Sequence, residues 1–296
     1  MSSQPLTAHD DGTASGSVPV HGPVTVVLEV PGGSVQVDAT GDDHEVLVRV
    51  EPRNRAAADL VRHLDLTVDA DTVAIVVPKR HGPSGRGGPQ FDVRATVPAR
   101  SGLRASTASA ELSVTGVLGE VDISTASGDV DLPHIGGGRV SVASGDVSVR
   151  EVDGAVSVEY ASGDVAVGRT GDSLRSRSAS GDVHLGEVGG DLAASSASGD
   201  VDIGRVAARC TAQTASGDVS VAVVVGPAAR LTTVSGDVRV GVPDGTAVWL
   251  DVKTLSGGLD SDFTGVTSGS GAPAGIDRVL ELAVSTLSGD VAVRRV

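Results

Sequence analysis

The sequence has very few aromatic residues and a single cysteine. Among 296 residues there are one Trp, one Tyr and two Phe, whereas Gly alone fills 40 positions. A core without large rings must be built from Val, Ala, Leu and Ile, which suits narrow stacked coils and disfavours a large ligand pocket. The lone Cys210 excludes an intramolecular disulfide, so the chain neither needs nor indicates an oxidising compartment.

Positive charge and long apolar runs are also scarce. The chain has 23 Lys and Arg against 38 Asp and Glu, a formal net charge of -15. Such a field repels nucleic-acid phosphates and anionic lipids, so no nucleic-acid partner is expected. No apolar run approaches membrane-spanning length, and residues 1–17 lack the features of a secretory signal. These absences predict a cytoplasmic protein without membrane insertion, residues 1–17 being a disordered tail; a surface location stays open.

What the sequence does contain is a repeat of about 18 residues. The tetrapeptide Ser-Gly-Asp-Val occurs eight times, with degenerate copies at Ser109 and Ser256. The glycines of the eight copies are Gly128, Gly145, Gly163, Gly181, Gly199, Gly217, Gly236 and Gly289. A fixed short period predicts one elongated array rather than two compact globules.

Apolar residues keep fixed offsets from these glycines. Val stands two positions after each glycine and Leu, Val or Ile four positions after it, as in a strand with alternate residues buried. A second apolar pair precedes the glycine by seven and five positions, and no helix for a crossover fits into so short a coil. The coils must therefore stack as a parallel β-solenoid, an all-β fold. Right-handed winding is expected from the general crossover preference, although a left-handed or two-sided coil also fits.

Three regions follow from these patterns. Residues 18–105 alternate as strands that cap the solenoid, with a short helix capped by Asn54 and a surface loop near residues 78–90. The repeat array covers residues 106–296. Within it, the Gly-, Ser- and Thr-rich stretch at 259–277 is expected to be an inserted loop.

The repeat motif itself has a structural and a chemical interpretation. Glycine supplies a positive φ at a corner, and aspartate can bond nearby backbone amides. Stacking brings the aspartates into one column, where like charges repel and Ca²⁺ between coils would relieve the repulsion. The candidate calcium ligands are Asp146, Asp164, Asp182, Asp200 and Asp218. One carboxylate per coil falls short of the six or more oxygens that Ca²⁺ takes, so the structural role is favoured and no cofactor is expected.

No catalytic constellation is evident. The histidines are scattered without zinc-ligand spacing, the serines sit in repeat corners, and Cys210 occupies a column of apolar residues. The chain is therefore expected not to be an enzyme. Trp249 lies on the outward side of its strand, and together with Phe263 it is the best candidate for a contact residue.

The run Thr-Ala-Ser-Gly-Asp-Val at Thr125 and Thr214, the segment PGGSVQV at residues 31–37 and VPARSGLRAST at residues 97–107 carry a family resemblance. The chain resembles the bacterial putative-adhesin family of β-strand-repeat proteins, a domain of unknown function common in actinobacteria and Bacillus relatives. The resemblance spans Val18 to the C-terminus. It implies a parallel β-solenoid without known enzymatic activity, and it carries no catalytic residues to transfer.

The leading hypothesis is a non-enzymatic scaffold that binds another protein through the flat sides of an acidic solenoid. The sequence names neither that partner nor the oligomeric state. One alternative is a secreted or surface adhesin, stiffened by calcium. A polysaccharide-active β-helix enzyme is a third, which would require clustered carboxylates on one face of adjacent coils.

Overall fold

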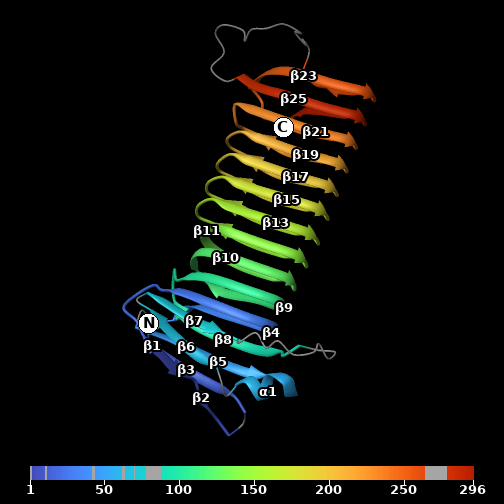
Figure 1. Cartoon of the computed structure of the whole chain (residues 1–296). Coiled ribbons are helices and arrows are strands. Elements are labelled where there is room, and N and C mark those ends of the chain that lie inside the picture. The colour runs from blue at the N-terminus through green and yellow to red at the C-terminus, as the bar shows by residue number, and fades with distance from the viewer. Residues whose placement is uncertain are drawn as a thin grey trace. The chain divides into compact units, whose positions relative to one another are not determined.

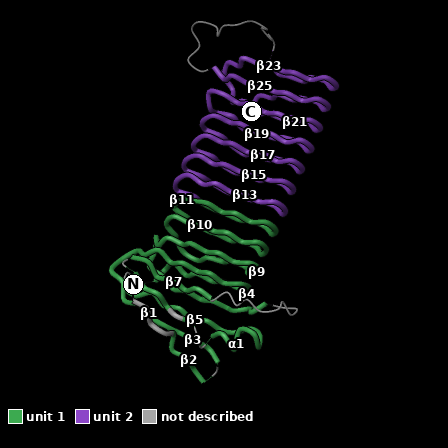
Figure 2. Tube along the Cα trace, viewed as in Figure 1, with its two compact units in different colours: residues 1–151 green, residues 152–296 purple. Residues whose placement is uncertain are grey.

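The computed structural model describes residues 2–10, 12–41, 44–61, 64–69, 71–77, 88–263 and 279–296. The chain divides into two compact units, residues 1–151 and residues 152–296 (Figure 2). Among the described residues, the first unit holds the helix α1 (Arg55–Val61) and the strands β1 (Ser2–Pro5), β2 (Thr7–Ala8), β3 (Ala14–Pro19), β4 (Thr25–Gly41), β5 (Glu45–Pro52), β6 (Asp65–Asp69), β7 (Thr72–Val76), β8 (Phe91–Pro98), β9 (Gly102–Gly116), β10 (Leu118–Ser127) and β11 (Val130–Ser144). Strand β12 (Val147–Val152) follows.

The first unit begins with antiparallel strands. Strand β3 pairs with β5, β5 with β8, β1 with β6 and β6 with β7. The expected disordered tail at residues 1–17 is therefore wrong, since β1, β2 and the start of β3 lie in it. Ala14 and Val18 are buried along β3, with Gly16 between them packed against the side chains of Leu6 and Leu66. Because the inward residues Ala14 and Gly16 are small, the sequence of β3 lacks the alternation of large apolar and polar residues that predicts a strand.

Strand β4 turns the antiparallel cap into a parallel stack. It pairs with β7 and β8 on one side and with β9 along its whole length on the other. Gly33 lies opposite Ala110 and has a φ of 115°, like the corner glycines of the repeats. The segment Gly-Gly-Ser-Val at residues 32–35 is thus a further degenerate coil of the array, far from the others in sequence. The stack continues through β9, β10 and β11 in parallel.

The predicted helix cap is confirmed. The backbone N–H of Ala57 donates to Asn54 Oδ1 at 2.9 Å, and the Asn54 amide donates in turn to the Gly88 carbonyl at 2.9 Å. Helix α1 buries Ala57, Leu60 and Val61. Residues 78–87 of the expected surface loop lie outside the described residues. No described helix is long and apolar enough to cross a membrane.

The second unit is built from coils of two strands each, which confirms the predicted all-β solenoid. The strands that precede each repeat corner form one stack (Figure 1): β13 (Val156–Ser162), β15 (Leu174–Ser180), β17 (Leu192–Ser198), β19 (Cys210–Ser216), β21 (Ala228–Ser235), β23 (Ala247–Ser256) and β25 (Val279–Ser288). The strands that follow each corner form the other: β14 (Val165–Thr170), β16 (Val183–Val188), β18 (Val201–Val206), β20 (Val219–Val224), β22 (Val238–Val242), β24 (Leu259–Ser261) and β26 (Val291–Arg295). Equivalent residues of successive coils lie in register, as Leu174 opposite Leu192 and Val183 opposite Val201 show.

The core of the second unit follows the predicted apolar columns. Val201, Val219 and Val238 are fully buried, as is Cys210, and burial raises the pKa of the Cys210 thiol to about 12. That cysteine is a small core side chain. The coils at β13 and β15 are less well matched, because the buried hydroxyls of Tyr160, Ser176 and Ser178 lie near one another without forming a hydrogen bond of good geometry.

The last two coils are stacked in the reverse of their sequence order. Strand β25 lies between β21 and β23 (Figure 1). In the other stack, β26 lies between β22 and β24. The coil β23–β24 is therefore the outermost described coil, although β25–β26 ends the chain. Strand β24 falls within the expected inserted loop at 259–277, and residues 264–278 lie outside the described residues. The exchange of the two coils leaves the register between neighbouring strands unchanged, since Ser235, Ser288 and Ser256 stand at equivalent positions.

Candidate interaction surfaces

The corner glycines form the most regular feature of the repeats. All eight have positive φ, from 113° at Gly181 to 150° at Gly289. A Cβ at Gly199 would clash with the carbonyl oxygen of Gly181 in the preceding coil, and one at Gly217 would clash with that of Gly199. Glycine is thus required twice over, by the backbone conformation and by the close approach of the next coil.

The corner aspartates link one coil to the next. Within each unit, Oδ1 of one corner aspartate accepts the backbone N–H of the aspartate in the following coil. The bonds run Asp129 to Asp146 at 3.0 Å in the first unit, and in the second Asp164 to Asp182 at 2.9 Å, Asp182 to Asp200 at 2.9 Å, Asp200 to Asp218 at 2.8 Å, Asp218 to Asp237 at 2.8 Å and Asp237 to Asp290 at 2.9 Å. The acceptor role expected of these aspartates is thus exercised between coils and not within a turn. We call this chain of bonds the aspartate ladder.

The ladder ends at the outermost described coil. Asp290 Oδ1 accepts the N–H of Gly258 at 2.7 Å, and Gly258 stands where the other repeats carry aspartate. At the ladder position this coil therefore has no carboxylate for a further parallel coil. The degenerate sequence Ser-Gly-Gly-Leu at Ser256 therefore marks the end of the stack in space.

Electrostatics differ along the ladder. Asp218 also receives the guanidinium of Arg239 at 3.0 Å, which reaches Asp237 at 3.0 Å as well. The backbone N–H of Asp237 and then Arg239 hold the pKa of Asp218 below its ordinary value of 3.8, against a smaller effect of desolvation. Among the described residues no group of three or more His, Cys, Asp and Glu side chains could hold a metal ion. Calcium binding by Asp146, Asp164, Asp182, Asp200 and Asp218 stays a hypothesis.

One outward side of the second unit carries a shallow hollow of about 500 Å³. Its floor is formed by Gly168, Gly186 and Gly204, and its wall includes His184 and Asp202, whose Nδ1 and Oδ2 atoms lie 3.4 Å apart. Glycoside cleavage needs two facing carboxyl groups, whereas Asp202 is the one carboxylate among the residues that line this hollow. The hollow gives no support to the polysaccharide-active alternative.

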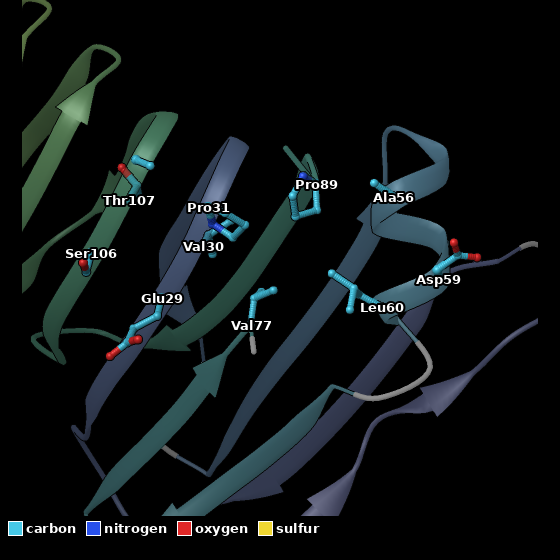
Figure 3. A pocket seen from close by; sticks show the side chains of 11 residues that line it. Glu29, Val30, Pro31, Ala56, Asp59, Leu60, Val77, Pro89, Ser106 and Thr107 are labelled. Atoms are coloured by element: carbon cyan, nitrogen blue, oxygen red, sulfur yellow. The ribbon is translucent and has the colours of Figure 1, made fainter. Parts of the chain in front are cut away.

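A deeper groove lies in the first unit, next to α1 (Figure 3). Its volume is about 600 Å³, and its lining comes from β4, β9, the end of β7, the start of β8 and α1. Val30, Leu60 and Val77 form apolar walls, and Glu29 and Asp59 place carboxylates at separate points of the rim (Figure 3). We call this site the α1 groove. This groove could not be predicted from the sequence, because its residues come from segments that are distant along the chain.

The predicted contact residues Trp249 and Phe263 lie in different settings. Trp249 lines a small hollow of about 140 Å³ on the outward side of β21, β25 and β23, together with Arg230, Glu281 and Asp251. The Arg295 guanidinium lies 4.5 Å from the ring centroid of Phe263, a cation–π contact. The structure therefore does not bring the two aromatic residues together in one hollow.

An exposed aliphatic column at the corner end of β21, β25 and β23 was not predicted from the sequence. Val234, Leu287 and Leu255 occupy equivalent positions of β21, β25 and β23, and their side chains are 46%, 51% and 80% exposed. The corresponding residue of the inner coils is alanine, as in Thr-Ala-Ser-Gly at Thr214. The change from Ala to Val or Leu before the corner was the signal available in the sequence.

Comparisons with known proteins place these features in a family. No curated protein matches the chain. Among solved structures, a putative adhesin from Bacteroides fragilis is 10% identical with a TM-score of 0.38, covering 95% of this chain and 97% of that one. A putative adhesin from Parabacteroides merdae is 9% identical with a TM-score of 0.39, at 98% and 100% coverage. A putative lipid binding protein from Parabacteroides distasonis is 13% identical with a TM-score of 0.37, at 95% and 96% coverage.

The family model described as Toastrack DUF4097 matches residues 32–224 and 191–294. The first match begins within β4, the degenerate coil, and the second reaches β26, so together they span the parallel stack of both units. The family resemblance expected from the repeats is confirmed. The chain belongs to the Toastrack DUF4097 family.

Proposed function

We propose that this protein is a non-enzymatic, adhesin-like scaffold that binds another protein through the α1 groove. The observation that carries the proposal is the composition of that groove, where apolar walls are combined with the carboxylates of Glu29 and Asp59. Apolar walls provide buried area, and carboxylates at the rim select for positive charge. The partner is therefore a protein segment that presents both apolar and basic side chains.

The groove is built on ordered elements, which suits recognition. Asn54 caps α1 and ties it to Gly88, so the helix that carries Asp59 is fixed at its start. Glu29 belongs to β4, which is paired on both sides. Binding to a preformed groove avoids much of the entropy cost of ordering the site.

The test is site-specific photo-crosslinking in cells. A crosslinking amino acid replaces Asp59, and the matched control replaces Asp131, an exposed carboxylate on an outward position of β11. A single partner captured from position 59 and not from position 131 supports the proposal. The purified partner should then bind Asp59→Lys at least about tenfold more weakly than Asp131→Lys. Equal binding by the two variants would contradict the assignment of the groove.

We also propose that the scaffold acts in the cytoplasm. Protease treatment of intact cells, followed by detection of the protein with an antibody, tests the location. Protection of the protein supports the cytoplasmic scaffold. Cleavage on intact cells would instead favour the surface-adhesin alternative and direct the search for partners outside the cell.

A further inference from the structure

The hollow lined by Trp249 is built on the outward face of three neighbouring strands. Its volume is about 140 Å³, which is room for about five water molecules. Strand β25 lies in the middle, and its Ala283 stands opposite Arg230 of β21 on one side and Asp251 of β23 on the other. The space arises because a small residue is surrounded by longer side chains. The hollow is therefore a feature of the sheet itself, since its lining residues all lie in strands.

Charged side chains of both signs surround Ala283. Arg230 and Glu281 are exposed, and the described residues include no ion-pair or side-chain hydrogen-bond partner for either. The Lys253 ammonium and the Asp251 carboxylate form an ion pair at 3.1 Å on the same face. The formal charges of these four groups cancel. The hollow thus offers hydrogen-bond donors and acceptors without a net charge.

Trp249 adds an aromatic surface at one end of the hollow. It stands opposite Glu281, and it is half-buried, so packing holds its ring in place. The hydroxyl-bearing residues Thr232 and Ser285 stand at the other end, two rows further along the sheet. An aromatic wall with polar groups around the remaining rim is a composition that fixes the orientation of a small ligand.

We propose that this hollow binds one hexopyranose ring, either as a free sugar or as the terminal residue of a glycan. A hexopyranose has C–H groups on one face, which pack on the electron-rich face of an aromatic ring. Its neighbouring hydroxyls donate to the carboxylates of Glu281 and Asp251 and accept from the guanidinium of Arg230.

The charges and the size of the hollow select a neutral ring over other ligands. An anion would face two carboxylates, and a cation would face the Arg230 guanidinium and the Lys253 ammonium. A peptide segment needs a longer groove than 140 Å³ provides. The hollow lies in the second unit and shares no residue with the α1 groove, so the two proposals succeed or fail independently.

The fluorescence of Trp249 reports binding directly, because it is the one Trp of the chain. The full chain is titrated with glucose, galactose, mannose and N-acetylglucosamine. At least one of them should change the emission with a Kd on the order of 1 mM, as expected for a small ligand in a shallow site. Sorbitol, which has the hydroxyls of a hexose but no ring, is the control and should leave the emission unchanged.

A glycan array probed with the full chain distinguishes the two sources of the sugar. Retention on glycans that end in the sugar bound in solution would assign the hollow to a terminal glycan residue. Binding of the free sugar without retention on the array would assign it to the free sugar.

Substitutions on the outward face test whether the sugar occupies this hollow. Ala283→Leu fills the hollow and should abolish binding, whereas Ala193→Leu, at the equivalent position of β17, should leave it unchanged. Arg230→Gln should weaken binding by about tenfold or more because a charged donor is lost. Arg175→Gln is the matched control at the equivalent position of β15. The melting temperature of each variant checks that the stack is intact.

Several results would overturn the proposal. Failure of every sugar and glycan to bind would do so, and so would binding that survives Ala283→Leu. An equal response to sorbitol would show a general effect of polyols on the emission. A response to free amino acids and not to sugars would reassign the hollow to a zwitterionic ligand. If Ala283→Leu does not fold, Arg230→Gln still decides, since it changes only an exposed side chain.

Discussion

The inner and outer coils of the second unit use one motif in two ways. From β13 to β20 each corner carries glycine and aspartate, the residue before the corner serine is alanine, and the inward columns are closed. From β21 onward that alanine becomes Val234, Leu287 or Leu255, and in the last coil the aspartate becomes Gly258. The corner glycine is kept throughout. The comparison separates what stacking requires from what the end of a stack requires.

Glycine at the corner is a requirement of stacking, and its removal should have the largest effect. Gly199→Ala adds a Cβ that meets the Gly181 carbonyl and adopts a positive φ, so we expect a loss of more than about 3 kcal/mol in the free energy of unfolding. Gly245→Ala also has a positive φ but no neighbour within 4 Å, and it should cost about 1 kcal/mol. Urea denaturation of both variants measures the difference. Equal losses would mean that the backbone conformation alone requires glycine.

The apolar side chains at core positions should contribute less to stability at the end of the stack than in its interior. Val219 is fully buried and Leu259 is 42% exposed at the equivalent position. Val219→Ala should therefore lower the free energy of unfolding by about 2 kcal/mol, whereas Leu259→Ala should cost less than about 1 kcal/mol in the monomer despite removing more atoms. Thermal unfolding at low protein concentration checks both values. A larger loss for Leu259→Ala than for Val219→Ala would show that the outer coil is covered.

Not every inner coil is optimal, and one should be improved by substitution. Ser176 is fully buried at a position occupied by Ala194 and Ala212 in later coils, and its hydroxyl forms no hydrogen bond of good geometry. Ser176→Ala should raise the free energy of unfolding by about 1 kcal/mol, because a buried unsatisfied hydroxyl is removed. Ala194→Ser is the inverse control and should cost a similar amount. Destabilisation by Ser176→Ala would show that the serine hydroxyl is bonded, to the nearby Tyr160 hydroxyl or to an internal water.

Lowering the pH should weaken the aspartate ladder at Asp218, whose carboxylate is paired with the Arg239 guanidinium. The pKa of Asp218 is lower in the folded protein than its ordinary value of 3.8, so its contribution to stability is present above about pH 4 and is lost as the pH falls through the folded pKa. Asp218→Asn should flatten this acid limb of the unfolding midpoint measured from about pH 6 to about pH 3. Arg239→Gln retains the Asp237 N–H and should flatten it only in part. An unchanged profile in both variants would remove the ladder from the acid response.

Removing calcium is expected to have the smallest effect on stability. The carboxylates of Asp182 and Asp200 each already accept a backbone N–H, and one carboxylate per coil provides too few oxygens for a typical site. Adding a chelator should therefore leave the melting temperature unchanged. A lower melting temperature, reversed by Ca²⁺ and reduced in Asp200→Asn, would revive the calcium-stiffened form of the adhesin hypothesis.

The sequence predicted the coils well and their order poorly. Fixed offsets from glycine identified the inward columns because a solenoid core is one-dimensional and repeats the same environment. The reversed order of β25 and β23 could not be found in this way, since Ser256 and Ser288 fit the same register. The available signal was local: Gly258 in place of aspartate and Leu255 in place of alanine.

For the candidate sites too, the features that depend on local sequence could be predicted and those that depend on long-range pairing could not. Trp249 was placed on the outward side by its parity along the strand, which depends only on local alternation. The α1 groove depends on bringing β4, β9 and α1 together, and β4 was not recognised as a coil because Gly33 stands far along the chain from Gly128. Long-range pairing of a degenerate repeat leaves little trace in a single sequence.

The position of β25 and β26 has a consequence for biosynthesis. A solenoid in sequence order can fold coil by coil as it leaves the ribosome, each new coil resting on the one before. Here β23 and β24 emerge before the coil on which they are stacked, because β25 and β26 follow them in the sequence. The coil β23–β24 therefore has no neighbour to rest on until β25 and β26 have been synthesised. A nascent chain that stops before β25 cannot close this end of the described stack.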